Sequence, residues 1–195
     1  MSVFRTALVR VVVIVLLVGC TFVPTSRISA ATPATLDAKG IERNTVDAYE
    51  KRGAVYGGWV KQDLRTLFQE GRESADNGLP GFRFRTFPRS KLPEVEVPFG
   101  LDLNLSNVKD AELKELAGLK NLTVLDLRGR PLTAAGLKEV AGFKSLTALR
   151  LHDMQGVDGG LEELANLNLL TALSLNDTQL TDAGLRAYPV NPNRP

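Results

Sequence analysis

His152 has the clearest potential for acid–base chemistry in this sequence, because it is the only histidine among the 195 residues. Asp153 follows it directly, and Asp126 falls on the neighbouring strand of the repeat described below, so a general-base arrangement can be drawn. Adjacent residues of a strand point to opposite faces, however, and no nucleophile motif, phosphate-binding loop or metal cluster accompanies the histidine. We therefore expect a surface histidine in a polar row, and a protein that is not an enzyme.

The composition excludes several other kinds of site. One cysteine and one histidine allow neither a disulfide scaffold nor a Cys/His zinc site, so we expect no metal and no cofactor. The formal charge is +2, and loss of Arg5 and Arg10 with residues 1–19 would leave 22 basic (24 − 2) and 22 acidic side chains. We expect no nucleic-acid binding from such a balance. Arginines and phenylalanines alternate over residues 82–91, which an amphipathic edge strand explains more simply than a nucleic-acid patch.

Cys20 ends a segment that has the layout of an export signal. Two arginines precede the apolar run Val11–Val18, which is too short for a comfortable membrane span. The tetrapeptide Leu17–Cys20 resembles a bacterial lipobox, which implies a signal peptide over residues 1–19, acylation of Cys20 and a flexible tether over residues 20–35. The protein would then be exported and anchored to the membrane at the cell envelope. Cleavage near residues 29–31 to give a secreted soluble product, or an uncleaved anchor, remain as alternatives.

A repeat of 24 residues begins at residue 98. Two complete units cover residues 122–145 and 146–169, a degenerate unit precedes them at 98–121, and an incomplete one follows at 170–188. Each unit combines a two-residue alternation, typical of a strand, with apolar residues at three-residue spacing, typical of a short helix. Thr133 and Thr181 are expected N-caps of two of these helices. Since no unit can bury its own apolar side, each depends on its neighbours.

The pattern resembles the leucine-rich repeat family. The motif LxxLxL recurs from Leu122, Leu146 and Leu170, and the segments TAAGL (133–137) and TDAGL (181–185) resemble the short-helix repeats of bacterial members. The resemblance implies an α/β fold, a short solenoid with parallel strands on the concave face and short helices on the convex face. The sequence departs from the family pattern in two ways. Arg130, Met154 and Thr178 stand where many repeats carry asparagine. In the unit that begins at residue 146, Gly156 takes the place of a leucine and Val157 comes one position late, which implies an altered loop.

Residues 36–97 are expected to form an irregular α+β cap that covers the first repeat. Spacing predicts a helix over 36–52 ended by Gly53, a short strand at 53–56 and a second helix over 60–72. Residues 73–81 have turn composition, and 82–85 alternate like a strand whose pattern continues over 92–97. The expected core of the cap includes Tyr56 and Trp59. The tail at 189–195 is expected to fray.

The expected concave face carries two rows of polar residues and is the candidate binding face for a protein partner of unknown identity. The rows are Asp102, Asp126, Arg150 and Ser174, and Asn104, Arg128, His152 and Asn176. Their mixed charge favours a non-catalytic protein–protein interaction module. The alternative is a structural envelope component that self-associates by end-to-end stacking through the C-terminal repeat edge, and an enzyme using His152 is the third hypothesis.

Overall fold

The computed structural model describes residues 40–62, 65–104, 106–129, 132–152, 158–176, 178 and 181–187. All of them belong to one unit of the chain, residues 33–195, and this unit has the expected mixed α/β class. Several sequence predictions lie outside the described residues: the signal peptide, the tether, the tail, Cys20, Arg130, Asp153, Met154, Gly156 and Val157. Within the described ranges, every helix is too short or too polar to cross a lipid bilayer.

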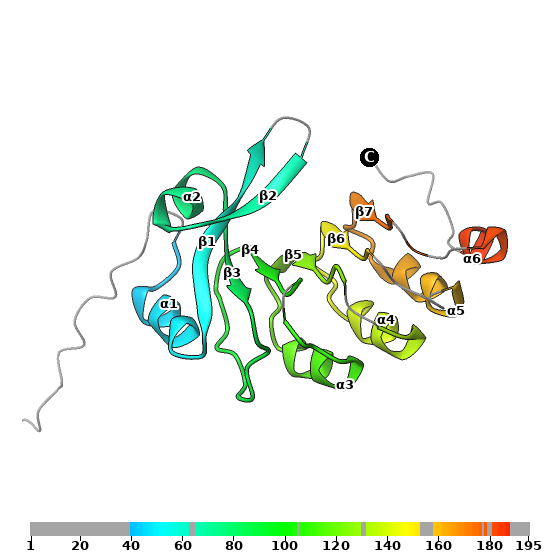
Figure 1. Cartoon of the computed structure of the whole chain (residues 1–195), viewed down its shortest axis with the longest axis horizontal. Helices are drawn as coiled ribbons and strands as arrows, with labels where there is room; N and C mark the ends of the chain where they lie inside the picture. Colours follow the sequence, from blue (N-terminus) through cyan, green and yellow to red (C-terminus); the bar gives the residue numbers. More distant parts are fainter. Residues whose placement is uncertain are drawn as a thin grey trace, which may run out of the picture. The chain divides into compact units, whose positions relative to one another are not determined.

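Seven strands form one curled sheet in the order β2-β1-β3-β4-β5-β6-β7 (Figure 1). β1 runs antiparallel to both of its neighbours, β2 and β3, whereas β3 to β7 run parallel to one another. The strands are β1 (Ala54–Gln62), β2 (Arg65–Glu70), β3 (Leu79–Phe84), β4 (Phe99–Asp102), β5 (Leu122–Asp126), β6 (Ala148–Arg150) and β7 (Ala172–Ser174).

The parallel strands stack in the register that the 24-residue spacing predicts. Leu101 pairs with Leu125, Leu125 with Leu149 and Leu149 with Leu173, so equivalent residues of successive units lie side by side. The first three of these leucines are fully buried and the last is partly buried. Successive units therefore share one apolar stripe, as expected if each buries the exposed side of its neighbour.

A row of threonines links the same strands at their beginnings. The hydroxyl of Thr123 donates to the carbonyl of Phe99, that of Thr147 to Thr123, and that of Thr171 to Thr147, each at 3.1 Å. These threonines recur at 24-residue intervals as the second residue of each LxxLxL motif. They form a side-chain ladder along the parallel strands.

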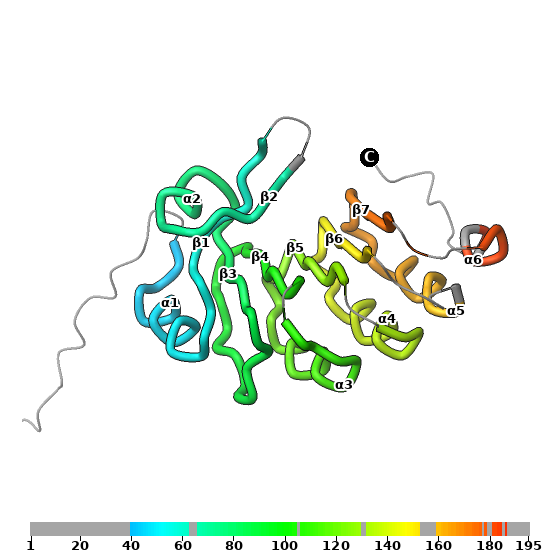
Figure 2. Tube along the Cα trace, viewed as in Figure 1, coloured from blue at the N-terminus to red at the C-terminus, as the bar shows by residue number. Residues whose placement is uncertain are grey.

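The helices that follow the parallel strands lie along one side of the sheet (Figure 2). They are α3 (Asp110–Leu113), α4 (Ala134–Val140), α5 (Asp158–Leu161) and α6 (Asp182–Ala187), with 3-10 turns at Lys114–Leu116 and Glu162–Asn166. Both predicted N-caps are confirmed: the hydroxyl of Thr133 accepts from the amide of Ala135, and that of Thr181 from Gly184.

The glycine of the TAAGL segment and its equivalent in the next unit allow these helices to approach closely. A Cβ on Gly136 would collide with the carboxylate of Asp110 on α3, and one on Gly160 would lie 2.9 Å from the Cα of Ala134 on α4. Neither glycine has a positive φ. Lack of a side chain, rather than unusual backbone conformation, is therefore what these positions require.

The N-terminal part contains α1 (Arg43–Glu50) and α2 (Arg72–Asn77) around β1 to β3. Gly53, at φ +89°, ends the turn after α1 and donates its N–H to the carbonyl of Glu50. The helix expected over 36–52 is shorter, since α1 begins at Arg43 and its C-cap is Lys51 rather than Gly53. The core of this N-terminal part is continuous with the core of the repeats. Within it, the ring of Tyr49 stacks on that of Phe82, with 4.0 Å between the ring centroids.

Three local predictions for this part were wrong. The expected helix over 60–72 is the β1–β2 hairpin, where Trp59 pairs with Phe68 and their rings meet edge to face at 5.7 Å. The expected turn at 73–81 contains α2, and the expected strand over 92–97 forms no strand. Pairing between β1 and β2 outweighs the helical spacing of Leu64, Leu67 and Phe68, because it buries two large aromatic side chains.

Candidate binding groove

A groove of about 500 Å³ lies between the edge strand β2 and the face of β5, β6 and β7. The hairpin forms one wall and the repeat strands form the other. Its apolar lining comes from Leu67, Val124, Ala148, Leu149, Ala172 and Leu173. Its polar lining comes from Thr66, Arg128, Arg150, His152, Ser174 and Asn176.

Strand register arranges the repeat wall in three rows two residues apart. The first row is apolar and small, with Val124 beside Ala148 and Ala148 beside Ala172. The second row follows in the same register as Asp126, Arg150 and Ser174. Alternation along a strand puts Arg128, His152 and Asn176 in a third row beyond it. The rows at 126 and 128 were predicted, but the small apolar row was missed.

Asp102 and Asp126 were expected on the accessible concave face, and this prediction was wrong. Both are 0% exposed. Asp102 accepts from Nε and Nη2 of Arg83 at 2.8 Å each. Asp126 accepts from Nε of Arg128 at 2.8 and 2.9 Å and lies 3.5 Å from Nη1 of Arg150. The two carboxylates are therefore taken up by the arginine side chains that they pair with, rather than open to a ligand.

Two groups of this cluster, Asp102 and Arg128, have shifted pKa values. Desolvation raises the pKa of Asp102, the negative charge of Asp126 raises it further, and the amide of Asn104 and the guanidinium of Arg83 oppose the rise. The carboxylate of Asp126 in turn raises the pKa of Arg128, mainly through their hydrogen bond. The guanidinium of Arg128 therefore stays charged under ordinary conditions.

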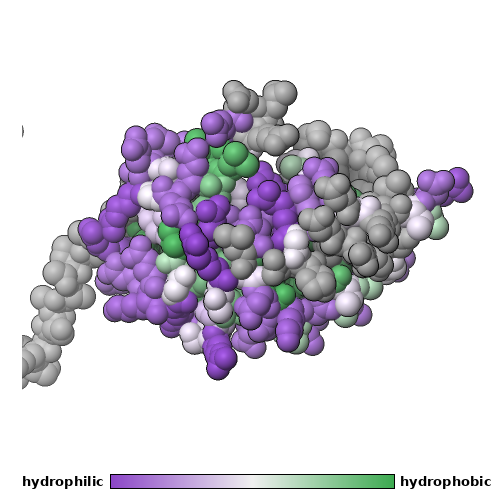
Figure 3. Space-filling view, in the orientation of Figure 1, coloured by the Kyte–Doolittle hydropathy of each residue, from purple (hydrophilic) through white to green (hydrophobic). Residues whose placement is uncertain are grey.

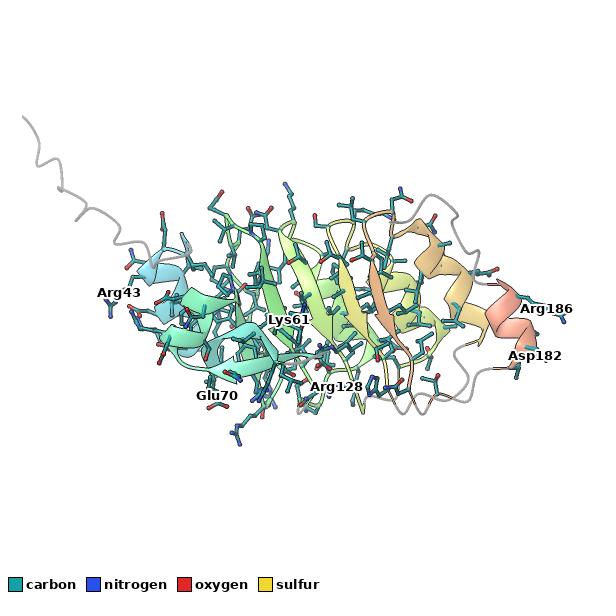
Figure 4. All side chains as sticks on the ribbon, turned by 90° about the horizontal axis from the view of Figure 1, so that it is seen from above. Arg43, Lys61, Glu70, Arg128, Asp182 and Arg186 are labelled. Atoms are coloured by element: carbon teal, nitrogen blue, oxygen red, sulfur yellow. The ribbon has the colours of Figure 1, made fainter. Side chains whose placement is uncertain are left out.

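Two arginines hold the hairpin against the face of the sheet. Arg150 donates to the carbonyl of Thr66, and its guanidinium lies 5.0 Å from the ring of Trp59. Arg83 donates to the carbonyl of Phe68 at 3.4 Å, and its guanidinium lies 4.6 Å from the centre of the Phe68 ring. Figure 4 shows the hairpin from above, crossing the strands, with Arg128 near its free end.

His152 and Asp126 do not form the general-base pair considered from the sequence, because the carboxylate of Asp126 pairs with Arg128 and Arg150. Nε2 of His152 instead lies 2.6 Å from Oγ of Ser174 on the next strand. The sequence predicts His152 and Ser174 in neighbouring rows of the face. Because they are diagonal neighbours across β6 and β7, their contact could have been predicted from the register.

The eight predicted face residues thus separate into groups. Five line the groove: Arg128, Arg150, His152, Ser174 and Asn176. Asp102 and Asp126 lie buried beneath the surface, and Asn104 does not line the groove. The wall formed by the β1–β2 hairpin was not predicted, because a helix was expected over residues 60–72.

The chemistry available in the groove is that of hydrogen-bond donation beside an apolar surface. The described residues contain no group of three side chains suited to a metal ion. Figure 3 shows mainly hydrophilic side chains with an apolar patch over the hairpin, where Val60 and Leu67 are paired and partly exposed. Neither a scan against protein-family models nor a search of curated proteins finds a match to this chain.

Proposed function

We propose that this protein is a non-catalytic protein-binding module, built on a short leucine-rich repeat solenoid over residues 98–188. The stacking of Leu101, Leu125, Leu149 and Leu173 at 24-residue intervals supports the solenoid. The groove between β2 and the repeat strands is the observation that carries the binding function. Its volume lies within the range of ordinary ligand sites, about 300–1,000 Å³.

Capture from a cell-envelope extract with the tagged full chain tests the binding function. Ala172→Trp would fill the groove from an exposed position, and Lys138→Trp places the same side chain on the exposed surface of α4. We expect at least one protein to be captured by the wild type and by Lys138→Trp but not by Ala172→Trp. Arg128→Glu and Arg150→Glu should also lose it. Identical capture by all variants would contradict the proposal.

We further propose that the protein is exported and held at the cell envelope by lipid on Cys20. The support is the lipobox-like tetrapeptide that ends in the only cysteine of the chain. Two or more acyl chains would give stable anchoring. Mass spectrometry of the mature N-terminus should find a diacylated Cys20 as the first residue. An unmodified Cys20, or a chain that starts near residue 31, would contradict this proposal.

A second candidate function is self-association through the last repeat. Leu173 and Leu175 are only partly buried, whereas their equivalents Leu149 and Leu151 are fully buried, and Leu169 is 57% exposed. Stacking of another copy on this end would cover them. Size-exclusion chromatography distinguishes the two functions, since particle size should grow with concentration if copies stack and stay constant if the module binds another protein as a monomer.

The 2.6 Å contact between His152 and Ser174 favours a third candidate, hydrolysis with serine as the nucleophile. The non-catalytic proposal expects no reaction of Ser174 with a fluorophosphonate probe. Covalent labelling of Ser174 that disappears in His152→Ala would replace the binding proposal by an enzymatic one.

A further inference from the structure

A row of small residues crosses the face of the sheet that carries the groove. Its members pair in register from β3 to β7 and are Gly81, Gly100, Val124, Ala148 and Ala172. Residues that pair directly on neighbouring strands lie on the same face, about 4.8 Å apart. The row therefore forms a shallow trough across these strands, in which no side chain is larger than that of valine.

The indole of Trp59 fills the glycine end of this trough. A Cβ on Gly100 would collide with Nε1 of Trp59, and one on Gly81 would lie 3.0 Å from the same atom. Trp59 is only 3% exposed, and its Nε1 has no hydrogen-bond partner among the described residues. The two missing side chains thus make room for one flat aromatic ring, which packing holds in place without a hydrogen bond.

The alanine end of the same trough is open. Val124, Ala148 and Ala172 line the groove of about 500 Å³, and Leu67 of the hairpin bounds it. Each alanine contributes only a methyl group, so the floor is low across β6 and β7. Among the described residues, no phenylalanine, tyrosine or tryptophan lines this part. The open end therefore repeats the small-residue floor on which Trp59 lies, but without a ring of this kind on it.

Arg150 marks the boundary between the filled end and the open end. Its side chain begins on β6 and lines the groove, and its guanidinium lies 5.0 Å from the centre of the Trp59 ring. Arg150 also donates to the carbonyl of Thr66 and lies 3.5 Å from the carboxylate of Asp126. Such hydrogen bonds use the edges of the guanidinium plane and leave its two faces for aromatic rings. Within the described part of the chain, Trp59 is the one ring that lies against Arg150.

We infer that the groove binds an aromatic side chain of a protein partner, which lies flat on Ala148 and Ala172 and stacks on the second face of Arg150. The guanidinium then lies between the partner's ring and Trp59. The small floor admits any apolar group of suitable size, but only an aromatic ring adds the attraction between its negative face and the guanidinium. This inference rests on the proposed binding function and specifies its ligand.

Selection from a library of displayed random heptapeptides tests the inference without a known partner. The full chain is the bait, and peptides that still bind Ala172→Trp are discarded. We expect the groove-dependent sequences to be enriched in Phe, Tyr or Trp. In a synthetic peptide with phenylalanine at that position, cyclohexylalanine keeps the bulk of the side chain but removes its π face. This exchange should weaken binding at least about threefold.

Arg150→Gln separates stacking from a general effect on the fold. Glutamine can still donate to the carbonyl of Thr66, but it carries no charge. The preference for phenylalanine over cyclohexylalanine should therefore disappear in this variant. If Arg150 only supported the fold, both peptides would bind more weakly by the same factor and the preference would persist. Lys138→Gln, which removes a positive charge from the exposed surface of α4, should leave both affinities unchanged.

The results distinguish failure of this inference from failure of the proposed function. Groove-dependent peptides without an aromatic residue, or equal affinity for the phenylalanine and cyclohexylalanine peptides, would overturn the inference but leave the binding function intact. No groove-dependent peptide at all would count against both. Binding of phosphatidylglycerol vesicles that is lost in Ala172→Trp would show a lipid ligand and overturn the inference.

Discussion

Asp126 is the residue on which the floor of the groove depends. Its buried carboxylate pairs with Arg128 and Arg150. Arg150 in turn contacts the hairpin, at the carbonyl of Thr66 and the ring of Trp59. Asp126→Asn would keep the size of the side chain but remove the charge that both guanidiniums face. We expect a loss of about 3 kcal/mol in the free energy of unfolding, measured by urea denaturation.

Glu139→Gln is the matched control for this change, because Glu139 forms a more exposed ion pair with Lys114 at 3.7 Å. Its loss should alter the free energy of unfolding by less than about 0.5 kcal/mol. Equal effects of the two substitutions would mean that the buried cluster contributes no more than a surface pair.

Asp102 should make stability depend on pH. Because its pKa is raised from an ordinary value of 3.8, the native state binds more protons than the unfolded state between that value and the raised one. The contribution of this group is therefore complete below pH 3.8 and is lost as pH rises through the raised pKa. The free energy of unfolding of wild type minus that of Asp102→Asn should fall across this window.

Urea denaturation at a series of pH values measures that difference, and most other carboxylates cancel in it. Asp76→Asn, which removes an exposed carboxylate from α2, serves as the control for loss of one acidic side chain. A constant difference between wild type and Asp102→Asn from pH 4 upward would show that burial of Asp102 has no effect on its titration.

Helices α4 and α5 offer a test at the level of elements. Gly159 and Gly160 are neighbours in α5, but a Cβ on Gly159 would meet nothing within 4 Å, whereas one on Gly160 would meet the side chain of Leu137 at 2.8 Å and the Cα of Ala134 at 2.9 Å. Gly159→Ala should raise the melting temperature through a gain of about 0.5–1 kcal/mol. Gly160→Ala should lower it through a loss of about 1–3 kcal/mol.

The repeat strands could be predicted from the sequence because their information is local and periodic. LxxLxL at 24-residue intervals determines which residues pair, and the register of Leu125 with Leu149 follows directly. The hairpin could not be predicted in the same way, because Leu64, Leu67 and Phe68 have a spacing that also suits a helix. What decides its structure is contact with distant residues, including Arg150, which lies 84 positions from Thr66.

The candidate site shows the same division. Five of its residues follow from the alternation of the repeat strands, but the wall formed by Thr66 and Leu67 comes from a segment before the repeats. Asp102, which is fully buried, likewise pairs with Arg83, a residue that precedes the repeats. A repeat pattern predicts which way a side chain faces, but it carries no information about what covers it.

At the scale of the whole molecule, the core is continuous from Ile41 and Tyr49 in the cap to Leu170 in the last repeat. β3 pairs with β4 in the same sheet, so no boundary in hydrogen bonding separates the cap from the repeats. Because one sheet and one core join these two parts, we expect the described residues to unfold as one cooperative unit.

Leu151→Ala tests that cooperativity, because Leu151 is fully buried in the repeats while the only tryptophan, Trp59, lies in the cap. The substitution should cost about 2–5 kcal/mol and lower the urea midpoint seen by Trp59 fluorescence as much as that seen by far-ultraviolet circular dichroism. Leu169→Ala makes the same chemical change at a side chain that is 57% exposed and should leave both midpoints close to wild type. If Leu151→Ala shifted only the dichroism midpoint, the cap and the repeats would unfold separately, and the shared core would not couple the hairpin wall of the groove to the repeat wall.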